Sequence, residues 1–303
     1  MSGSLIQRWA NPRRILLATS LTDLRFTLPI AMQQSLAYHA ELKIAHVLPN
    51  PDNLLAAPPV SARLRKAAET ALKKTVVTAH NAGIQCSFSL ESGDVVREVI
   101  RLTGKWKADR LIAGSQGKEK PHLHLLGSVA ESIFHSIEIP ALAVGPKLNM
   151  AQTSPKTPLR IVFAASLDHD SQRIAKFALS VAESHGAHIF LLHVCPEIAK
   201  GHPSAARVTD YAIAMLQDLL KARAIKKCIP SCDVVQGQPV DAILAHAKRH
   251  SADMIILGAS AHSAFDSRFI PGTAYRVLCE SRCPVLVLKQ DSSWTRKTLA
   301  TIE

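Results

Sequence analysis

A glycine-containing stretch between residues 114 and 128 carries the residues best suited to chemistry in this chain. Gly114 and Gly117 precede a nine-residue spacer that ends at Gly127-Ser128. A short apolar run before the stretch predicts a buried strand, and a helical pattern follows it. Glycine lets other groups approach the backbone closely or adopts positive φ, and a helix start attracts anions. The spacing predicts a phosphate cradle, although turn glycines followed by an ordinary serine N-cap give the same pattern.

The spacer itself carries four cationic or titratable side chains, Lys118, Lys120, His122 and His124. These groups could screen the charge of a bound phosphate, and an exposed loop in a basic protein is the plain alternative. The pair His122-x-His124 has no cysteine or carboxylate pair beside it, so it does not predict a metal site.

Composition limits the classes of partner. The chain has 303 residues, of which 47% are hydrophobic and 20% charged, and its net charge is +12. This charge favours anionic partners, but no basic run is interleaved with aromatic residues, so we expect no dedicated nucleic-acid role. No apolar run is long enough for a membrane helix. Residues 15–18 are too short for a signal-peptide core, so we expect a cytoplasmic protein.

The sequence contains an internal repeat. Landmarks of the first half recur in the same order after about 145 residues, which identifies a duplicated domain. We predict domains over residues 12–146 and 158–290, joined by a proline-containing linker at 145–158. The matching landmarks are Arg14-Ile15-Leu16 with Arg160-Ile161-Val162, His46-Val47 with His193-Val194, Gly93-Asp94 with Gly237-Gln238, Ala108-Asp109 with Ala252-Asp253, and Gly127-Ser128 with Gly272-Thr273.

Within each copy, short apolar runs alternate with helical patterns. This alternation is typical of βα units and of an α/β fold with a parallel sheet. In the first copy we predict helices over residues 27–40, with Pro29 in the first turn, and 61–81. In the second copy we predict a helix closed by Gly186 and another over residues 206–224.

Several polar residues have a structural explanation. Asp94 and Asp241 stand where helices begin, so we interpret them as helix-start residues rather than catalytic acids. His46 and His193 lie at matching strand ends and are interpreted as structural. Trp106 is expected to pack at a helix end.

Taken together, the motifs resemble a known family. The His-Val strand ending, the Gly-Asp before a helix, the Ala-Asp-x-x-Ile-x-Gly strand, the glycine loop and the final Pro-x-Leu-x-Val strand are similar to those of universal stress proteins of the UspA type, here in tandem. The resemblance implies, for each domain, an open parallel sheet of order 3-2-1-4-5, like that of adenine-nucleotide α-hydrolases. It also implies a nucleotide at the carboxyl ends of strands 1 and 4, where strand order reverses.

In ATP-binding members, the glycine loop holds the phosphates and ribose, and an aspartate ending strand 1 contacts the adenosine. Here Ser20 replaces that aspartate, and Asp23, three residues further on, could reach back. The resemblance therefore implies that the first domain binds ATP, alone or with Mg²⁺, at a site that departs from the family at one position. Its cofactor-binding residues would be Ala18, Ser20, Val47, Ala113, Gly114, Gly117, Gly127, Ser128 and Val129.

The second domain departs further from the family. Its loop has Ala261 where a second glycine is expected, and the spacer before Gly272-Thr273 is one residue longer. Ser166 again replaces the aspartate. We expect this half to bind nucleotide weakly or not at all, because a Cβ hinders both positive φ and close phosphate approach.

The six cysteines predict reduced thiols rather than a disulfide scaffold. Two pairs, Cys228-x3-Cys232 and Cys279-x3-Cys283, could suggest a four-thiolate zinc site. In the implied strand order, however, Cys232 precedes strand 3 and Cys283 precedes strand 5, at opposite edges of one sheet. We therefore expect no metal site.

Three classes of function remain open. The first is a nucleotide-responsive regulatory module whose hydrolysis of ATP is slow at most. The second is a nucleotide-independent scaffold or chaperone-like protein. The third, an ATP pyrophosphatase, is disfavoured because Ser20-Leu21-Thr22-Asp23 stands where such enzymes carry a Ser-Gly-Gly-x-Asp-Ser loop.

Assembly is expected to involve the last strand of each domain. Residues 140–144 and 284–288 are apolar edge strands that need covering. Pairing of the two domains within one chain would cover them, and a homodimer remains open.

Overall fold

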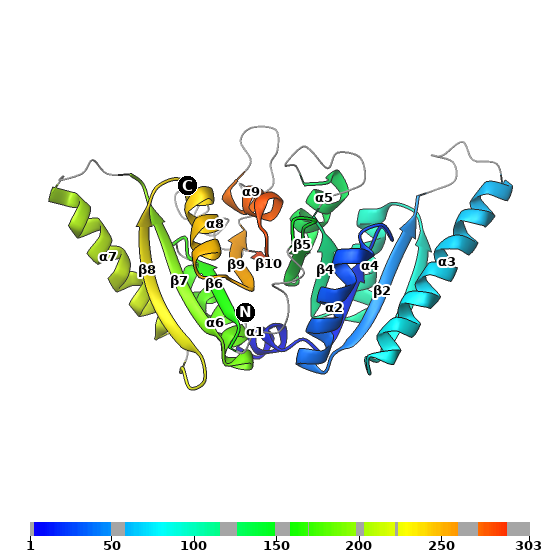
Figure 1. Cartoon of the computed structure of the whole chain (residues 1–303), viewed down its shortest axis with the longest axis horizontal. Coiled ribbons are helices and arrows are strands. Elements are labelled where there is room, and N and C mark those ends of the chain that lie inside the picture. Colours follow the sequence, from blue (N-terminus) through cyan, green and yellow to red (C-terminus); the bar gives the residue numbers. More distant parts are fainter. Residues whose placement is uncertain are drawn as a thin grey trace, which may run out of the picture. The chain divides into compact units, whose positions relative to one another are not determined.

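A computed structural model describes residues 3–49, 58–115, 126–148, 158–168, 170–197, 203–221, 224–259 and 272–289. The chain divides into two compact units. One comprises Asn11–Leu148, and the other comprises Asn149–Glu303 together with Met1–Ala10. Figure 1 shows the elements of both. None of the described helices is long and apolar enough to cross a membrane.

The first unit is an open parallel sheet with helices between its strands. Its strand order is β3-β2-β1-β4-β5, which confirms the predicted order 3-2-1-4-5. In chain order the elements are β1 (Arg14–Ala18), α2 (Leu24–Tyr38), β2 (Glu41–Leu48), α3 (Pro58–Asn81), β3 (Cys86–Ser92), α4 (Val95–Trp106), β4 (Arg110–Gly114), α5 (Ser128–Ser136) and β5 (Ala141–Val144).

The second unit repeats this plan. Its strands follow the order β8-β7-β6-β9-β10, which is the same 3-2-1-4-5 arrangement. In chain order the elements are α1 (Gly3–Ala10), β6 (Arg160–Ala164), α6 (Ser171–His185), β7 (His188–Cys195), α7 (Pro203–Leu220), β8 (Ile229–Gln236), α8 (Pro239–Arg249), β9 (Met254–Ala259), α9 (Thr273–Glu280) and β10 (Val285–Lys289).

Helix α1 was not predicted from the sequence. It packs against α6 of the second unit, although it precedes the first unit in the chain. Ile6, Trp9 and Ala10 are buried. The apolar positions of α1 therefore complete the second unit.

Helix boundaries follow local signals in most places. Asp94 is the N-cap of α4, and its carboxylate accepts a hydrogen bond from the backbone N–H of Arg97 at 2.8 Å. Asp241 lies in the first turn of α8, as an acidic residue at a helix start. Gly186 ends α6 in the left-handed conformation, with φ of 55°.

Several helix boundaries were predicted wrongly: α3 begins at Pro58 rather than at residue 61, and α7 covers Pro203–Leu220 rather than residues 206–224. Helix α2 begins at Leu24, three residues before the predicted start, because the carbonyl of Asp23 accepts the N–H groups of Phe26 and Thr27. Pro29 therefore lies inside the helix rather than in its first turn. The ring removes one backbone donor there, and the helix continues through it.

Candidate functional site

The carboxyl end of β1 is the point where strand order reverses. β1 pairs with β2 on one side and with β4 on the other, so Ala18 lies level with Ala45 and with Ala113. In open parallel sheets, ligands bind outside the carboxyl ends of the strands at such a reversal. The chain leaves β1 there through a tight turn, in which Leu21 has φ of 70°.

Asp23 folds back over this reversal point. Its side chain is buried, and its carboxylate accepts hydrogen bonds from Thr19 Oγ1 and, at 3.3 Å, from the backbone N–H of Ser20. Asp23 is also the N-cap residue of α2, but its side chain makes no capping bond. The carboxylate thus faces the strand ends rather than the helix, and no cationic side chain of the described residues pairs with it.

Gly114 provides the space for this carboxylate. A Cβ built on Gly114 would lie 2.8 Å from Asp23 Oδ2, a separation that real Cβ atoms do not show. Gly114 is not one of the glycines with positive φ. Glycine is therefore needed at position 114 for close approach of another group rather than for positive φ. The group that approaches is the carboxylate of Asp23.

The N-terminus of α5 lies at the other end of the loop. Its N-cap is Gly127, with φ of −63° and ψ of 140°, and Ser128 is the first helical residue. The alternative of a serine N-cap is therefore wrong. Gly127 has no side chain with which to cap the helix, and among the described residues no side chain is seen to accept a hydrogen bond from the N–H groups of its first turn. They carry the partial positive charge of the helix dipole.

Ser115 connects strand β4 to this helix start. Its backbone N–H donates to the carbonyl of Val144 at 3.0 Å, and its own carbonyl accepts the N–H of Gly127 at 3.1 Å. The hydroxyl of Ser115 is fully buried and has no hydrogen-bond partner in the part of the chain that the structure describes. A polar group is thus held beside the glycine loop with its hydrogen-bonding capacity unused. No motif named this residue, although it directly follows Gly114.

The other predicted residues occupy different places. Val47 is buried near the end of β2, and Val129 is exposed in the first turn of α5. Ser20 is exposed, and its hydroxyl pairs with that of Thr22 at 3.0 Å rather than lying over the strands. Gly117 lies outside the described residues, as do Lys118, Lys120, His122 and His124.

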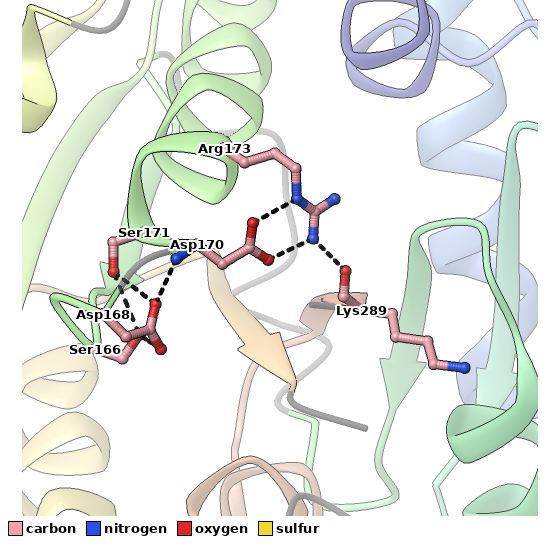
Figure 2. Close-up of polar contacts among 6 residues, drawn as sticks. All are labelled: Ser166, Asp168, Asp170, Ser171, Arg173 and Lys289. Carbon is pink, nitrogen blue, oxygen red and sulfur yellow. Dashed lines mark hydrogen bonds and ion pairs between the residues drawn. The ribbon is translucent and has the colours of Figure 1, made fainter. Parts of the chain in front are cut away.

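The corresponding place in the second unit is occupied by an ion pair (Figure 2). Asp170, the N-cap residue of α6, receives two hydrogen bonds of 2.7 Å from the guanidinium of Arg173. The same guanidinium donates to the backbone carbonyl of Lys289, the last residue of β10. Arg173 therefore links the start of α6 to the carboxyl end of β10.

The turn before α6 also closes on itself. Asp168 accepts hydrogen bonds from the hydroxyls of Ser166 and Ser171, at 2.8 and 3.1 Å, and from the N–H of Asp170 at 3.0 Å. Ser166, the counterpart of Ser20, is thus bound within its own turn (Figure 2). The predicted Ala261 lies outside the described residues.

The two strand-end histidines hold the turns that follow the first strands. Nδ1 of His46 lies 2.8 Å from the carbonyl oxygen of Thr19, and Nδ1 of His193 lies 2.8 Å from that of Ala165. A carbonyl only accepts, so Nδ1 carries the proton in both rings. This supports the structural interpretation of both histidines.

The cysteine thiols are unsuited to nucleophilic chemistry. Burial raises the pKa of Cys86 and of Cys283 to about 11, so both thiols are protonated at neutral pH. Cys232 lies on β8 and Cys283 lies two residues before β10, and these strands are at opposite ends of the second unit's strand order. The two cysteine pairs therefore do not converge.

The repeated open parallel sheets of strand order 3-2-1-4-5 define a duplicated α/β fold. The Universal stress protein family matches residues 12–145 and 159–289. The chain therefore belongs to the universal stress protein family, as a tandem of two such domains.

The chain is similar to individual proteins in sequence or in structure. A universal stress protein of Thermus aquaticus is 27% identical over 126 residues, which cover 40% of this chain and 91% of the relative. The crystal structure of a universal stress protein from Archaeoglobus fulgidus has a TM-score of 0.73 at 20% identity, covering 94% of this chain and 99% of that one. A second structure from that organism, in complex with dAMP, has a TM-score of 0.32 at 20% identity and covers 43% of this chain and 98% of its own.

Proposed function

We propose that the chain is a cytoplasmic stress-response module that binds one adenine nucleotide in its first domain. The ligand is ATP, alone or with Mg²⁺, and binding regulates the protein rather than driving rapid catalysis. The site lies at the carboxyl ends of β1 and β4 and extends to the N-terminus of α5. The second domain binds no nucleotide.

The observation that carries this proposal is the carboxylate of Asp23. It is buried at the reversal point, over Gly114, and no described cation neutralises it. A buried carboxylate without a cation is costly unless hydrogen-bond donors satisfy it. Ribose hydroxyls and the exocyclic amine of adenine are donors of this kind. Asp23 thereby takes the place that the family gives to the residue at Ser20.

The phosphates would meet the other half of the site. The uncapped first turn of α5 offers backbone N–H groups and the positive end of a helix dipole to an anion. The backbone carbonyl of Ser115 accepts the N–H of Gly127, and the Ser115 hydroxyl has no hydrogen-bond partner among the described residues. Donors for phosphate and an acceptor for the nucleoside thus flank the same glycine loop.

A titration of the full chain with ATP by calorimetry, with and without Mg²⁺, tests the proposal. Gly127→Ala adds a Cβ at the N-cap of α5, and we expect it to weaken ATP binding at least about tenfold, equivalent to about 1.4 kcal/mol. Gly272→Ala is the matched control, because Gly272 is the N-cap of α9 in the second domain. Both changes perturb a helix start equally, and only the first should alter affinity.

Three outcomes would contradict the proposal. Equal affinity of wild type and Gly127→Ala would show that the α5 terminus does not hold the phosphates. Complete absence of ATP binding by folded wild-type protein would instead favour the nucleotide-independent scaffold. Release of pyrophosphate from ATP would indicate the enzyme class that the sequence disfavours.

A further inference from the structure

Two imidazoles and a carboxylate gather in the second unit, away from the strand ends described above. Asp233 lies in the middle of β8, His246 in the last turn of α8, and His250 is the C-cap residue of that helix. One ligand atom from each side chain lies within 4.8 Å of the other two. His246 Nε2 and Asp233 Oδ2 are 3.3 Å apart.

Helix geometry and packing hold the two imidazoles in place. The four-residue spacing puts both on one side of α8, where their ring centroids are 4.3 Å apart. Phe190 of β7 packs against both rings, with its centroid 4.2 Å from that of His250 and 5.9 Å from that of His246. The imidazoles are therefore positioned by the fold before any ligand binds.

The cluster is partly buried and partly open. His246 is only 3% exposed, and the ring nitrogen that faces Asp233 is Nε2. An ion would therefore be bound through Nε2, and the buried Nδ1, which has no hydrogen-bond partner among the residues that the structure describes, would keep the ring proton. Asp233 is 37% exposed in its side chain, so the cluster is open to solvent on one side.

The first unit carries no such ligands at the matching positions. When the two domains are aligned on their strands and helices, Ser89 is equivalent to Asp233, Leu102 to His246 and Trp106 to His250. The ring of Trp106 is instead covered by Lys43, whose Nζ is 4.9 Å from the ring centroid. The same place in the fold therefore holds a cation–π pair in one unit and a set of ligand atoms in the other.

We propose that Asp233, His246 and His250 bind a divalent transition-metal ion of the zinc type. Two imidazoles with one carboxylate form a ligand set that suits Zn²⁺, whereas Mg²⁺ and Ca²⁺ prefer oxygen ligands alone. Around zinc, ligand atoms at about 2.0 to 2.2 Å from the ion lie about 3.4 Å from one another. His246 Nε2 and Asp233 Oδ2, at 3.3 Å, already have this spacing. Small side-chain rotations at the exposed side bring the remaining ligand atoms to the same spacing.

The ligand count defines the type of site. Three protein ligands leave one tetrahedral position for water, as in open zinc sites rather than closed four-ligand structural ones. The cluster is separate from the strand ends that would hold a nucleotide, so metal binding here is independent of ATP.

Titration of the full chain with Zn²⁺ alone, by calorimetry, tests this proposal. We expect one ion per chain at this site, with Asp233→Asn and His250→Gln each weakening binding at least about tenfold. Cys232→Ser is the matched control, since Cys232 adjoins Asp233 on β8 and its side chain points to the opposite face. A second control, His122→Gln with His124→Gln, removes the histidine pair of the glycine loop. Neither control should change affinity.

Thermal unfolding and Co²⁺ binding report metal binding itself, which a variant that folds but lacks the metal ligands would not show. Zn²⁺ should raise the Tm of wild type and of Cys232→Ser but leave that of Asp233→Asn unchanged. Bound Co²⁺ should show d–d absorption without a thiolate charge-transfer band. The proposal is overturned if wild type binds no Zn²⁺ at micromolar concentration, if Asp233→Asn binds as wild type does, or if binding is lost with Cys232 or with the loop histidines.

Discussion

The two domains share one backbone plan but treat the acidic residue before their second helix in opposite ways. In the first domain, Asp23 folds over Gly114 at the strand reversal, and its partners among the described residues are a hydroxyl and an N–H. In the second domain, the carboxylate of Asp170 accepts hydrogen bonds from Nε and Nη2 of Arg173. No described cation pairs with the first carboxylate, whereas the second is neutralised by Arg173.

A single position accounts for much of this difference. The third residue after the acidic N-cap is Phe26 in the first domain and Arg173 in the second. The phenyl ring is buried and cannot pair with Asp23, whereas the arginine reaches both Asp170 and the end of β10. Once a domain is duplicated, one copy can replace a ligand by its own side chain while the fold stays the same.

The largest effect is expected from breaking the ion pair of the second domain. Arg173→Ala leaves Asp170 buried without its cation, and we expect the free energy of unfolding to fall by about 2 to 3 kcal/mol. Urea unfolding measures this change. Arg25→Ala is the control, because Arg25 is an exposed residue of the first turn of α2, and it should cost less than about 1 kcal/mol.

A double variant sharpens this result. Asp170→Ala combined with Arg173→Ala removes both charges, so it should be more stable than Arg173→Ala alone. If the double variant loses more stability than the single one, the penalty does not come from an unpaired carboxylate. The contrast with Asp23 would then lose its physical basis.

A smaller effect is expected at Glu183, which also distinguishes the domains. Its carboxylate accepts backbone hydrogen bonds of 2.9 to 3.0 Å from Lys226, Lys227 and Cys228. Burial alone would raise the pKa of Glu183, but these backbone donors lower it to about 2. Leu36, which is exposed, stands at the matching position of α2.

The pH dependence of this contribution follows from the direction of the shift. Because the folded-state pKa lies below the ordinary value of about 4.3, the stabilisation is complete above about pH 5. It is lost as the pH falls towards 2. At neutral pH we expect Glu183→Gln to cost about 1 to 2 kcal/mol, a figure kept low by the solvent around this carboxylate. Urea unfolding from pH 7 to pH 3 should show the two proteins converging in acid, and a constant difference would contradict this assignment.

The smallest difference between the domains is expected at the strand-end histidines. His46→Leu and His193→Leu each remove one hydrogen bond to a backbone carbonyl, so each should cost about 1 kcal/mol. An asparagine at either position can restore the donor and should recover part of the loss. Clearly unequal losses in urea unfolding would mean that the domains differ in their framework as well as at the site.

The fold was largely predictable because its signals are local and repeated. Apolar runs such as Ile15 to Leu17 are completely buried in the sheet, and the second copy confirmed each element of the first. The boundary at Pro29 was misplaced because a backbone carbonyl, rather than a recognisable capping side chain, starts the helix. Helix α1 was missed because its apolar face is explained only by α6, which is distant in the chain.

The site was less predictable because it depends on where side chains point. The sequence named Asp23 as a residue that could reach back, and the structure places its carboxylate over Gly114. The buried hydroxyl of Ser115 has no sequence signature. His246 and His250 could have been noticed from their helical spacing, but nothing in the sequence brings Asp233 beside them without the position of β8.

We expect one nucleotide site per chain. The stoichiometry of ATP binding tests this expectation most directly. Calorimetric titration of the purified, nucleotide-free chain with ATP and Mg²⁺ should give one ATP per chain in wild type and in Gly272→Ala, with much weaker binding in Gly127→Ala. Two equivalent sites per chain, or one site that is lost with Gly272→Ala and kept with Gly127→Ala, would contradict the assignment of the site to the first domain.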